Sequence, residues 1–306
     1  MRYVIRSCYL ENTYEHPIGL DRFLLLKRCR GVLAAALEIE HIFDQLISNY
    51  IAAETRCLEL TSTRLVRKHV GYREANEALA SVGLVFANYL STARAYVDKL
   101  GRAASRCLDD SDADEAARSV KRMLAEQYDA AFDYRFIEAL RNHVQHSGAA
   151  LHILSQGSRR VNIGTTQSES VFETFLVPKC SKARLAELGG FKARVLAECP
   201  GEINLLDCTR GHVLGLSRVH RNVRDLMATA VSAAAARIQE GQAELTGKVT
   251  GNLDATEAVA IDGEEERPDS VPLVLHWEGV RRWLAERNSG VPDGLRTLPS
   301  GRCDPR

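Results

Sequence analysis

Apolar residues recur at intervals of three and four positions over much of the first 130 residues. This spacing puts them on one face of an α-helix, where they can pack against a core. The pattern predicts three long amphipathic helices, within about residues 21–60, over about 79–100, and from about residue 113. Their apolar stripes are Ile39, Phe43, Leu46 and Tyr50; Leu79, Val82, Phe86, Leu90, Ala93, Val97 and Leu100; and Ala116, Val120, Met123 and Leu124.

Capping residues mark the start of the third helix and the end of a fourth. Asp112, followed three residues later by Glu115, has the spacing of a capping box, so the acidic run 108–112 is interpreted as a loop. The fourth helix is predicted from about Asp133 to His146. Ser147 and Gly148 follow it, and glycine commonly ends a helix.

The pattern changes after residue 150. Leu151–Leu154 and Val171–Val177 are rich in aromatic and β-branched residues, which predicts two short strands. Gly157, Gly164 and the polar run 165–170 suit the loop between them.

Helical spacing returns over Lys182–Glu198, with a break at Gly189 and Gly190, and again over about Glu202–Glu240. The stretch after Gly241 is acidic, which predicts a linker. Beyond it we expect short strands at 259–261 and 273–275, a helix over 277–287, and a disordered tail from residue 290.

These elements predict a mainly α protein, with an antiparallel helical bundle, a small β-hairpin insertion and a small C-terminal α+β appendage. We expect four segments. Residues 1–148 form the N-terminal helical bundle, 149–181 the β insertion, 182–241 the C-terminal helices of the bundle, and 242–306 the acidic linker, appendage and tail.

Composition narrows the class of protein. The 40 basic and 40 acidic residues give a formal net charge of +0, so any nucleic-acid contact has to be local. The longest apolar stretch, Ala228–Ala236, is too short to cross a membrane, and charged residues near the N-terminus argue against a secretion signal. We therefore expect a cytoplasmic protein that does not bind membranes, with its 8 cysteines reduced and mostly buried.

The candidate chemistry lies at the end of the fourth helix, which carries an R-N-x-x-x-H pattern formed by Arg141, Asn142 and His146. At about 100° per residue, one face should be buried, with His143 as a core histidine. That face consists of Phe136, Ile137, Leu140, His143 and Val144, while Glu138, Asn142 and His146 fall on the opposite side. Carbonyl groups at the helix end favour a protonated His146 and a neighbouring arginine opposes it, which predicts titration near neutral pH.

The segment from Leu140 to Gly148, L-R-N-H-V-Q-H-S-G, resembles the R-N-[Y/F]-[V/I]-Q-H-x-G stretch of bacterial HEPN-like proteins (higher eukaryotes and prokaryotes nucleotide-binding superfamily). Asn88–Asp98 is similar to an earlier helix of those proteins, and the resemblance covers roughly residues 20–150. It implies an all-α bundle, a homodimer and, in active members, RNA cleavage without a metal. The motif's arginine, polar residue and histidine map onto Arg141, Asn142 and His146.

Basic residues elsewhere are weaker candidates for holding an RNA backbone. These are Arg64, Arg67 and Lys68 in one cluster, and Arg135 beside the motif. A further cluster comprises Arg218, His220, Arg221 and Arg224, and each of the two clusters is more typical of a solvated helix face. Glycine-rich phosphate loops and an H-E-x-x-H motif are absent from the sequence, so we expect no cofactor and no metal.

The sequence leaves three functions open. The first is a dimeric, metal-independent endoribonuclease of a toxin or phage-defence type, with an antitoxin or regulatory protein as partner. The second is a non-catalytic helical module that dimerises and binds a protein or a nucleotide. The third is a helical sensor regulated by its acidic C-terminal part.

Overall fold

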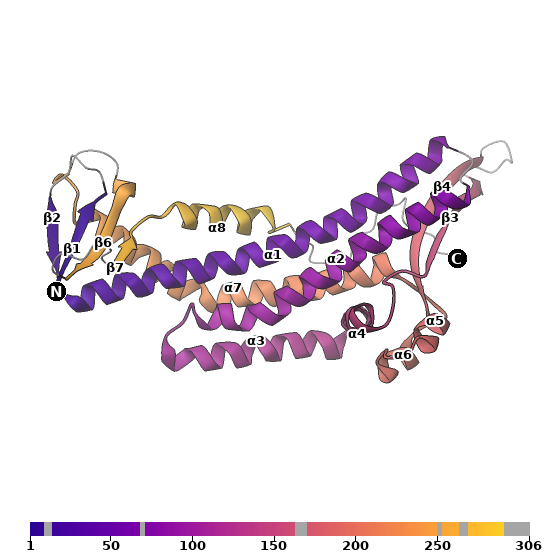
Figure 1. Ribbon diagram of the computed structural model, residues 1–306, viewed down its shortest axis with the longest axis horizontal. Helices are drawn as coiled ribbons and strands as arrows, with labels where there is room; N and C mark the ends of the chain where they lie inside the picture. The colour runs from indigo at the N-terminus through magenta and orange to yellow at the C-terminus, as the bar shows by residue number, and fades with distance from the viewer. Residues whose placement is uncertain (9–13, 68–70, 163–169, 250–252, 263–268, 291–306) are drawn as a thin grey trace. The chain divides into compact units, whose positions relative to one another are not determined.

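The computed structural model describes residues 1–8, 14–67, 71–162, 170–249, 253–262 and 269–290. It is mainly helical, with two small antiparallel sheets, as the sequence predicted in outline (Figure 1). The chain divides into two compact units. The first holds residues 1–43, 99–122 and 220–290, and the second holds 44–98 and 123–219 of the described residues.

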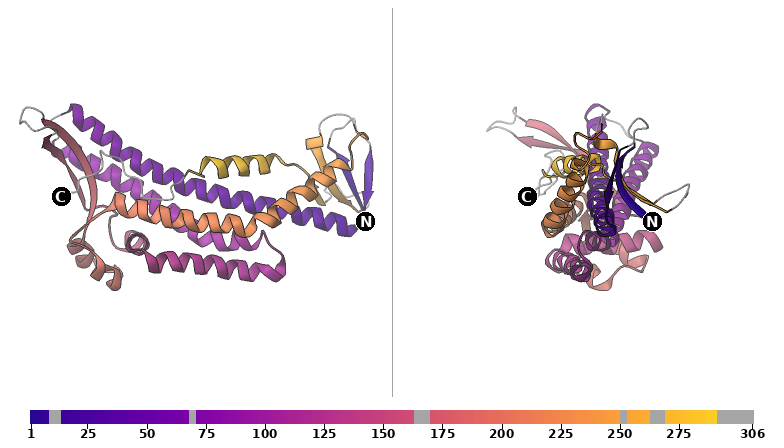
Figure 2. Two further views of the ribbon diagram at one scale, coloured as in Figure 1. Left: turned by 180° about the vertical axis from the view of Figure 1, so that it is seen from behind. Right: turned by 90° about the vertical axis from the view of Figure 1, so that its left-hand side faces the viewer.

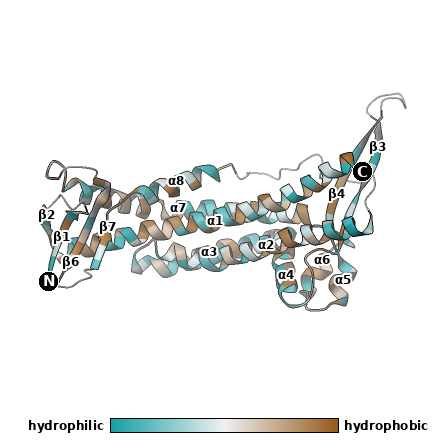
Figure 3. Ribbon diagram, turned by 45° about the horizontal axis from the view of Figure 1, so that its top comes forward, coloured by the Kyte–Doolittle hydropathy of each residue, from teal (hydrophilic) through white to brown (hydrophobic). Residues whose placement is uncertain are grey.

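Four helices contribute to both units, and hydrophilic and hydrophobic residues alternate around them (Figure 3). The helices are α1 (Leu20–Val66), α2 (Tyr72–Ser105), α3 (Asp110–Ala130) and α7 (Leu205–Ala243). The predicted stripes are largely buried, as Ile39, Phe86 and Val120 illustrate. The predicted cap at Asp112 is wrong, because α3 begins at Asp110 and the Asp109 carbonyl accepts the first helical hydrogen bonds.

The sheet of the first unit joins strands from the two ends of the described chain (Figure 1). Its order is β2-β1-β6-β7, all antiparallel, with β1 (Arg2–Ser7), β2 (Glu15–Ile18), β6 (Thr256–Ile261) and β7 (Asp269–Pro272). The sequence analysis missed β1 and β2, because β1 is short and pairs with residues some 250 positions away. Strand β6 pairs with β1, so β6 and β7 do not form a separate C-terminal appendage, and the strand predicted at 273–275 lies instead at β7.

Helix α8 (His276–Arg287) belongs to the same unit and matches the predicted short helix. Trp277 attaches the first turn of α8 to α1, since the guanidinium carbon of Arg30 in α1 lies 3.3 Å from the centroid of the indole ring. The Arg30 side chain is buried, and burial lowers the pKa of its guanidinium.

A buried carboxylate links α1 to α7 inside the first unit. Glu40 is 1% exposed, and its oxygens accept from Arg224 Nε and Nη2 at 2.7 and 2.6 Å and contact His220 Nε2 at 3.2 Å. The His220 ring stacks on Phe43 at 3.8 Å. Burial alone would raise the pKa of Glu40, but hydrogen bonds from His220 and Arg224 lower it to about 2.

The second unit contains the predicted β-hairpin. Strands β3 (Ile153–Asn162) and β4 (Ser170–Ser181) pair antiparallel, and β5 (Glu202–Asn204) adds to β4. The predicted loop position of Gly157 is wrong, because Gly157 pairs with Phe175 inside the ladder. A Cβ there would lie 3.1 Å from the Phe175 ring. The predicted helix start at Glu202 is also wrong, since residues 202–204 form β5.

Helices α4 (Phe132–His146), α5 (Lys182–Glu187) and α6 (Ala193–Glu198) complete the second unit. The predicted break at Gly189 and Gly190 is confirmed, and both glycines have positive φ. A second buried ion pair ties α1 to α7 here, as Arg210 Nε and Nη2 donate to the two Glu54 oxygens at 2.7 and 2.8 Å.

The described cysteines follow the prediction. None of these seven forms a disulfide, and all but Cys8 are buried. Cys303, Gly164 and the tail from residue 291 lie outside the described residues. Among the described helices, none combines the length and the hydropathy needed to cross a membrane.

We expect the free energy of unfolding to fall as the pH drops from about 4.5 towards 2. Glu40 has a folded-state pKa of about 2 against a reference value of 4.5, so its stabilisation is complete above pH 4.5 and is lost on protonation. Glu40→Gln should remove this part of the pH dependence and destabilise the protein at pH 7 by about 3 kcal/mol. Urea unfolding followed by circular dichroism at several pH values measures both effects.

Glu59→Gln is the matched control, because Glu59 forms an exposed pair with Arg56. It should change stability by less than about 1 kcal/mol. Equal pH profiles for the wild type and Glu40→Gln would contradict the proposed contribution of Glu40.

Candidate functional site at the end of helix α4

Helix α4 has the buried face that its sequence predicts. Phe136, Ile137, Leu140 and His143 are buried, and Val144 is half-buried. The helix ends as expected, because the N–H groups of Ser147 and Gly148 both donate to the His143 carbonyl at 2.8 and 3.1 Å. The apolar face therefore determines which side of α4 remains outside.

His143 is a core histidine, as predicted. It is 0% exposed, and its ring meets those of His152 and Phe191 with centroids 6.5 and 5.9 Å apart. Burial lowers the pKa of His143, which favours the neutral ring at physiological pH. A Cβ on Gly148 would lie 2.6 Å from His143 Nε2. The glycine after α4 thus leaves room for this histidine as well as ending the helix.

The structure brings two of the three motif residues together. Arg141 is half-buried, and its Nη1 donates to Asn142 Oδ1 at 3.0 Å. Asn142 and His146 are exposed, one turn apart on the outer side of α4. Among the described residues, His146 has no side-chain hydrogen bond or ion pair, so nothing in this part of the chain orients the imidazole.

Glu138 departs from the expectation of a solvent-facing residue. Its side chain is 18% exposed, with Oε2 at 3.5 Å from Arg94 Nη1 and Oε1 at 3.9 Å from His212 Nε2. Burial raises the pKa of the Glu138 carboxyl, although the charges of Arg94 and Arg141 oppose the rise. Glu138 does lie on the side of α4 that helical periodicity predicted. Periodicity within α4 cannot show, however, that α7 covers this residue.

His212 and Tyr89 form a buried polar pair that the sequence analysis missed. Tyr89 Oη lies 2.7 Å from His212 Nδ1, and both side chains are fully buried. Burial lowers the pKa of His212 to about 3 and raises that of Tyr89 well above its ordinary value, so both groups are neutral. With the Tyr89 hydroxyl donating to Nδ1, the remaining ring proton is on Nε2, which faces the Glu138 carboxylate.

Arg94 was also not predicted as part of this site, although it had a signal in the sequence. Arg94 and Asp98 form an i,i+4 ion pair at 2.6 Å, within the stretch that resembles a HEPN helix. His212 had none, because it is an isolated histidine in an apolar stripe.

The predicted RNA-binding residues do not gather at the motif. Arg64 donates to Gln156 Oε1 of β3 at 3.0 Å, Arg67 is exposed just after α1, and Lys68 lies outside the described residues. Figures 1 and 2 show this end of α1 beside the hairpin, with α4 on the other side of α2. Arg135 is close to the motif in sequence, but its guanidinium binds Glu198 at 2.7 Å and two backbone carbonyls.

The second basic cluster is only partly a solvated face. Arg218 and Arg221 are exposed, whereas His220 and Arg224 bind the buried Glu40. Within the described ranges, no three His, Cys, Asp or Glu side chains gather closely enough to hold a metal ion. The end of α4 therefore offers an amide, an imidazole and a guanidinium, groups suited to a phosphodiester.

Comparison with protein-family models, curated proteins and solved structures finds no match to this chain.

Gly148→Ala should destabilise the protein by about 1–3 kcal/mol, because the added methyl group overlaps a buried ring in a packed site. A Cβ would also lie 3.0 Å from Leu188 Cδ1. Thermal unfolding measures the loss.

Gly279→Ala is the control, since a Cβ at this position in α8 would meet no atom within 4 Å. It should stabilise the helix by about 0.5–1 kcal/mol. Similar effects of the two substitutions would show that His143 is not held as described.

Proposed function

We propose that this chain is an endoribonuclease of HEPN type that acts as a homodimer and needs no metal. The observation that carries the proposal is the exposure of Asn142 and His146 on the outer end of α4, with Arg141 hydrogen-bonded to Asn142. The sequence resemblance of this segment to HEPN-like proteins supports the same assignment.

The reaction follows from the chemistry of these side chains. Cleavage needs a base that takes the proton from the ribose 2′-hydroxyl, so that its oxygen attacks the adjacent phosphorus, and an acid that protonates the leaving 5′-oxygen. One chain supplies one exposed motif histidine, so a two-fold axis that pairs the α4 ends would supply both groups. His146 of one chain would act as base and that of the other as acid.

The neighbouring residues take supporting roles in this proposal. Arg141 stabilises the charge that develops on the phosphate oxygens, and Asn142 holds the arginine or a phosphate oxygen. Glu138 is a positioning residue, because its carboxylate attracts Arg141 while an ion pair with Arg94 holds the carboxylate in place.

A non-catalytic dimerisation or binding module is the second candidate. The observation in its favour is that no described residue orients His146 within one chain. In either case a toxin or phage-defence role, with an antitoxin or regulatory protein as partner, is consistent with an exposed motif.

We expect the purified protein to cleave cellular RNA in EDTA, and His146→Ala to reduce the rate by at least about a hundredfold, the usual contribution of a general acid or base. His41→Ala is the matched control, because His41 is also an exposed histidine on a helix. Gel analysis of total RNA measures the rate. Equal cleavage by wild type and His146→Ala would refute the role of this residue.

Mixtures of variant and wild-type chains test whether two chains share one active site. Excess His146→Ala chains should suppress wild-type cleavage, because mixed dimers hold one motif histidine in place of two. Excess His41→Ala chains should add activity. If wild-type chains cleave RNA at the same rate per chain in both mixtures, each chain acts alone and the shared cleft is wrong. A folded, dimeric wild type that leaves RNA intact would favour the binding module.

A further inference from the structure

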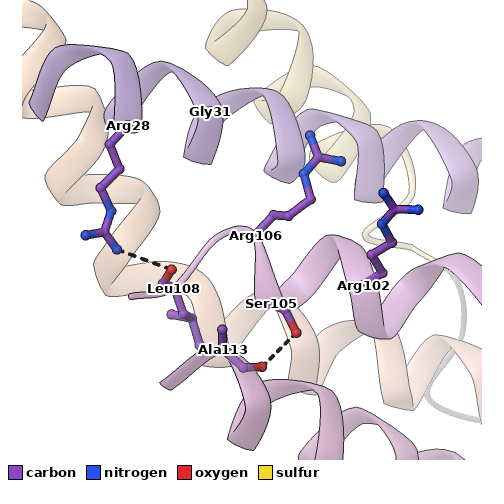
Figure 4. A pocket seen from close by; sticks show the side chains of 7 residues that line it. All are labelled: Arg28, Gly31, Arg102, Ser105, Arg106, Leu108 and Ala113. Carbon is purple, nitrogen blue, oxygen red and sulfur yellow. Dashed lines mark hydrogen bonds between the residues drawn. The ribbon is translucent and has the colours of Figure 1, made fainter. Parts of the chain in front are cut away.

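The first unit contains a pocket that is lined in part by arginines and is separate from the α4 motif. Its volume is about 440 Å³, and it is lined by residues of α1, of the end of α2, of the turn after it and of the start of α3. Figure 4 shows Arg102 and Arg106 extending towards α1, and Arg28 reaching from α1 to the turn. The lining residues are Arg28, Gly31, Arg102, Ser105, Arg106, Leu108 and Ala113.

The lining of this pocket contains three arginines and no carboxylate. Arg28 donates to the Leu108 carbonyl at 3.3 Å and pairs with Asp109, and Arg106 pairs with Glu38 at 2.7 Å. Arg102 is exposed and has no side-chain hydrogen bond or ion pair with another described residue. Among the three lining arginines, Arg102 is therefore the one that has no carboxylate partner among the described residues.

The two ion pairs are weakly held. The Arg106 and Glu38 side chains are 50% and 40% exposed, and Arg28 and Asp109 are more than 45% exposed. Exposed pairs contribute little to stability, so a ligand of higher charge can replace either carboxylate as the arginine's partner.

The pocket also has room beside α1. A Cβ built on Gly31 would meet no atom within 4 Å, and Ala113 adds only a methyl group to the lining. The Ser105 hydroxyl lies 2.7 Å from the Ala113 carbonyl and 3.1 Å from that of Gly101, so its proton is already bound. The arginines are therefore the groups left to contact an anionic ligand.

We propose that this pocket binds a phosphorylated small molecule, with Arg102 and Arg106 gripping the phosphate oxygens and Arg28 closing the other side. Guanidinium forks match phosphate oxygens in pairs, and three of them suit a group with several anionic oxygens. A volume of about 440 Å³ lies in the range of small-molecule sites. The proposal does not depend on the ribonuclease assignment, because the pocket and the motif use different residues.

Inorganic pyrophosphate is the probe, and isothermal titration calorimetry on the full chain is the measurement. Arg102→Gln should weaken binding about tenfold, because it removes a charge-assisted contact. Arg118→Gln is the matched control, since Arg118 is an exposed arginine of the same unit that pairs with Glu115 and does not line the pocket. Equal binding by these two variants would overturn the proposal.

Two substitutions test the pocket by shape and charge. Gly31→Leu should fill the space beside α1 and abolish binding, whereas Gly31→Ala should leave it intact. Glu38→Gln should tighten binding severalfold, because it frees Arg106 from its carboxylate partner. Thermal unfolding of each variant verifies its fold.

Unchanged binding by a folded Gly31→Leu, or no binding of pyrophosphate by the wild type, would refute the site. Binding of a short RNA that Gly31→Leu and Arg102→Gln abolish, without binding of pyrophosphate, would assign the surface to nucleic acid and overturn the small-molecule proposal.

Discussion

The pairing of buried polar residues on α7 is the constraint on which each unit depends. Arg210, His212 and His220 are all buried, and each meets one partner from another helix: Glu54, Tyr89 and Glu40. Apolar stripes tolerate small slips between helices, whereas a buried charge or ring nitrogen without its partner is costly. These pairs therefore select the register in which α1 and α2 pack against α7 inside each unit.

The same constraint decides what α4 presents. Its apolar face buries His143, and Glu138 lies half-buried between Arg94 and His212. With those two sides occupied, Asn142 and His146 remain exposed. The exposure of the motif is thus a consequence of packing one turn earlier in the helix, and it leaves the imidazole to be oriented by something outside the described residues.

Two places in this neutral chain have an arginine available to bind an anion: the motif at the end of α4 and the pocket of the first unit. The chain as a whole has a net charge of +0, and most described arginines are paired with carboxylates. Arg141 binds an amide and Arg102 has no partner among the described residues, so neither guanidinium forms an ion pair with a described carboxylate. A neutral protein can in this way keep positive potential at a motif and at a pocket without a general affinity for polyanions.

The sequence by itself determined the helices in outline, the hairpin, the buried face of α4 and the exposure of Asn142 and His146, because periodicity and helix ends are local properties. Only the tertiary structure decided the rest. Strand β1 pairs with β6 across the length of the chain, Glu138 is covered by α7, and three arginines from different elements meet at one pocket. A local sequence pattern does not specify which distant residue a given residue will contact, so these features are defined only when the helices and strands pack together.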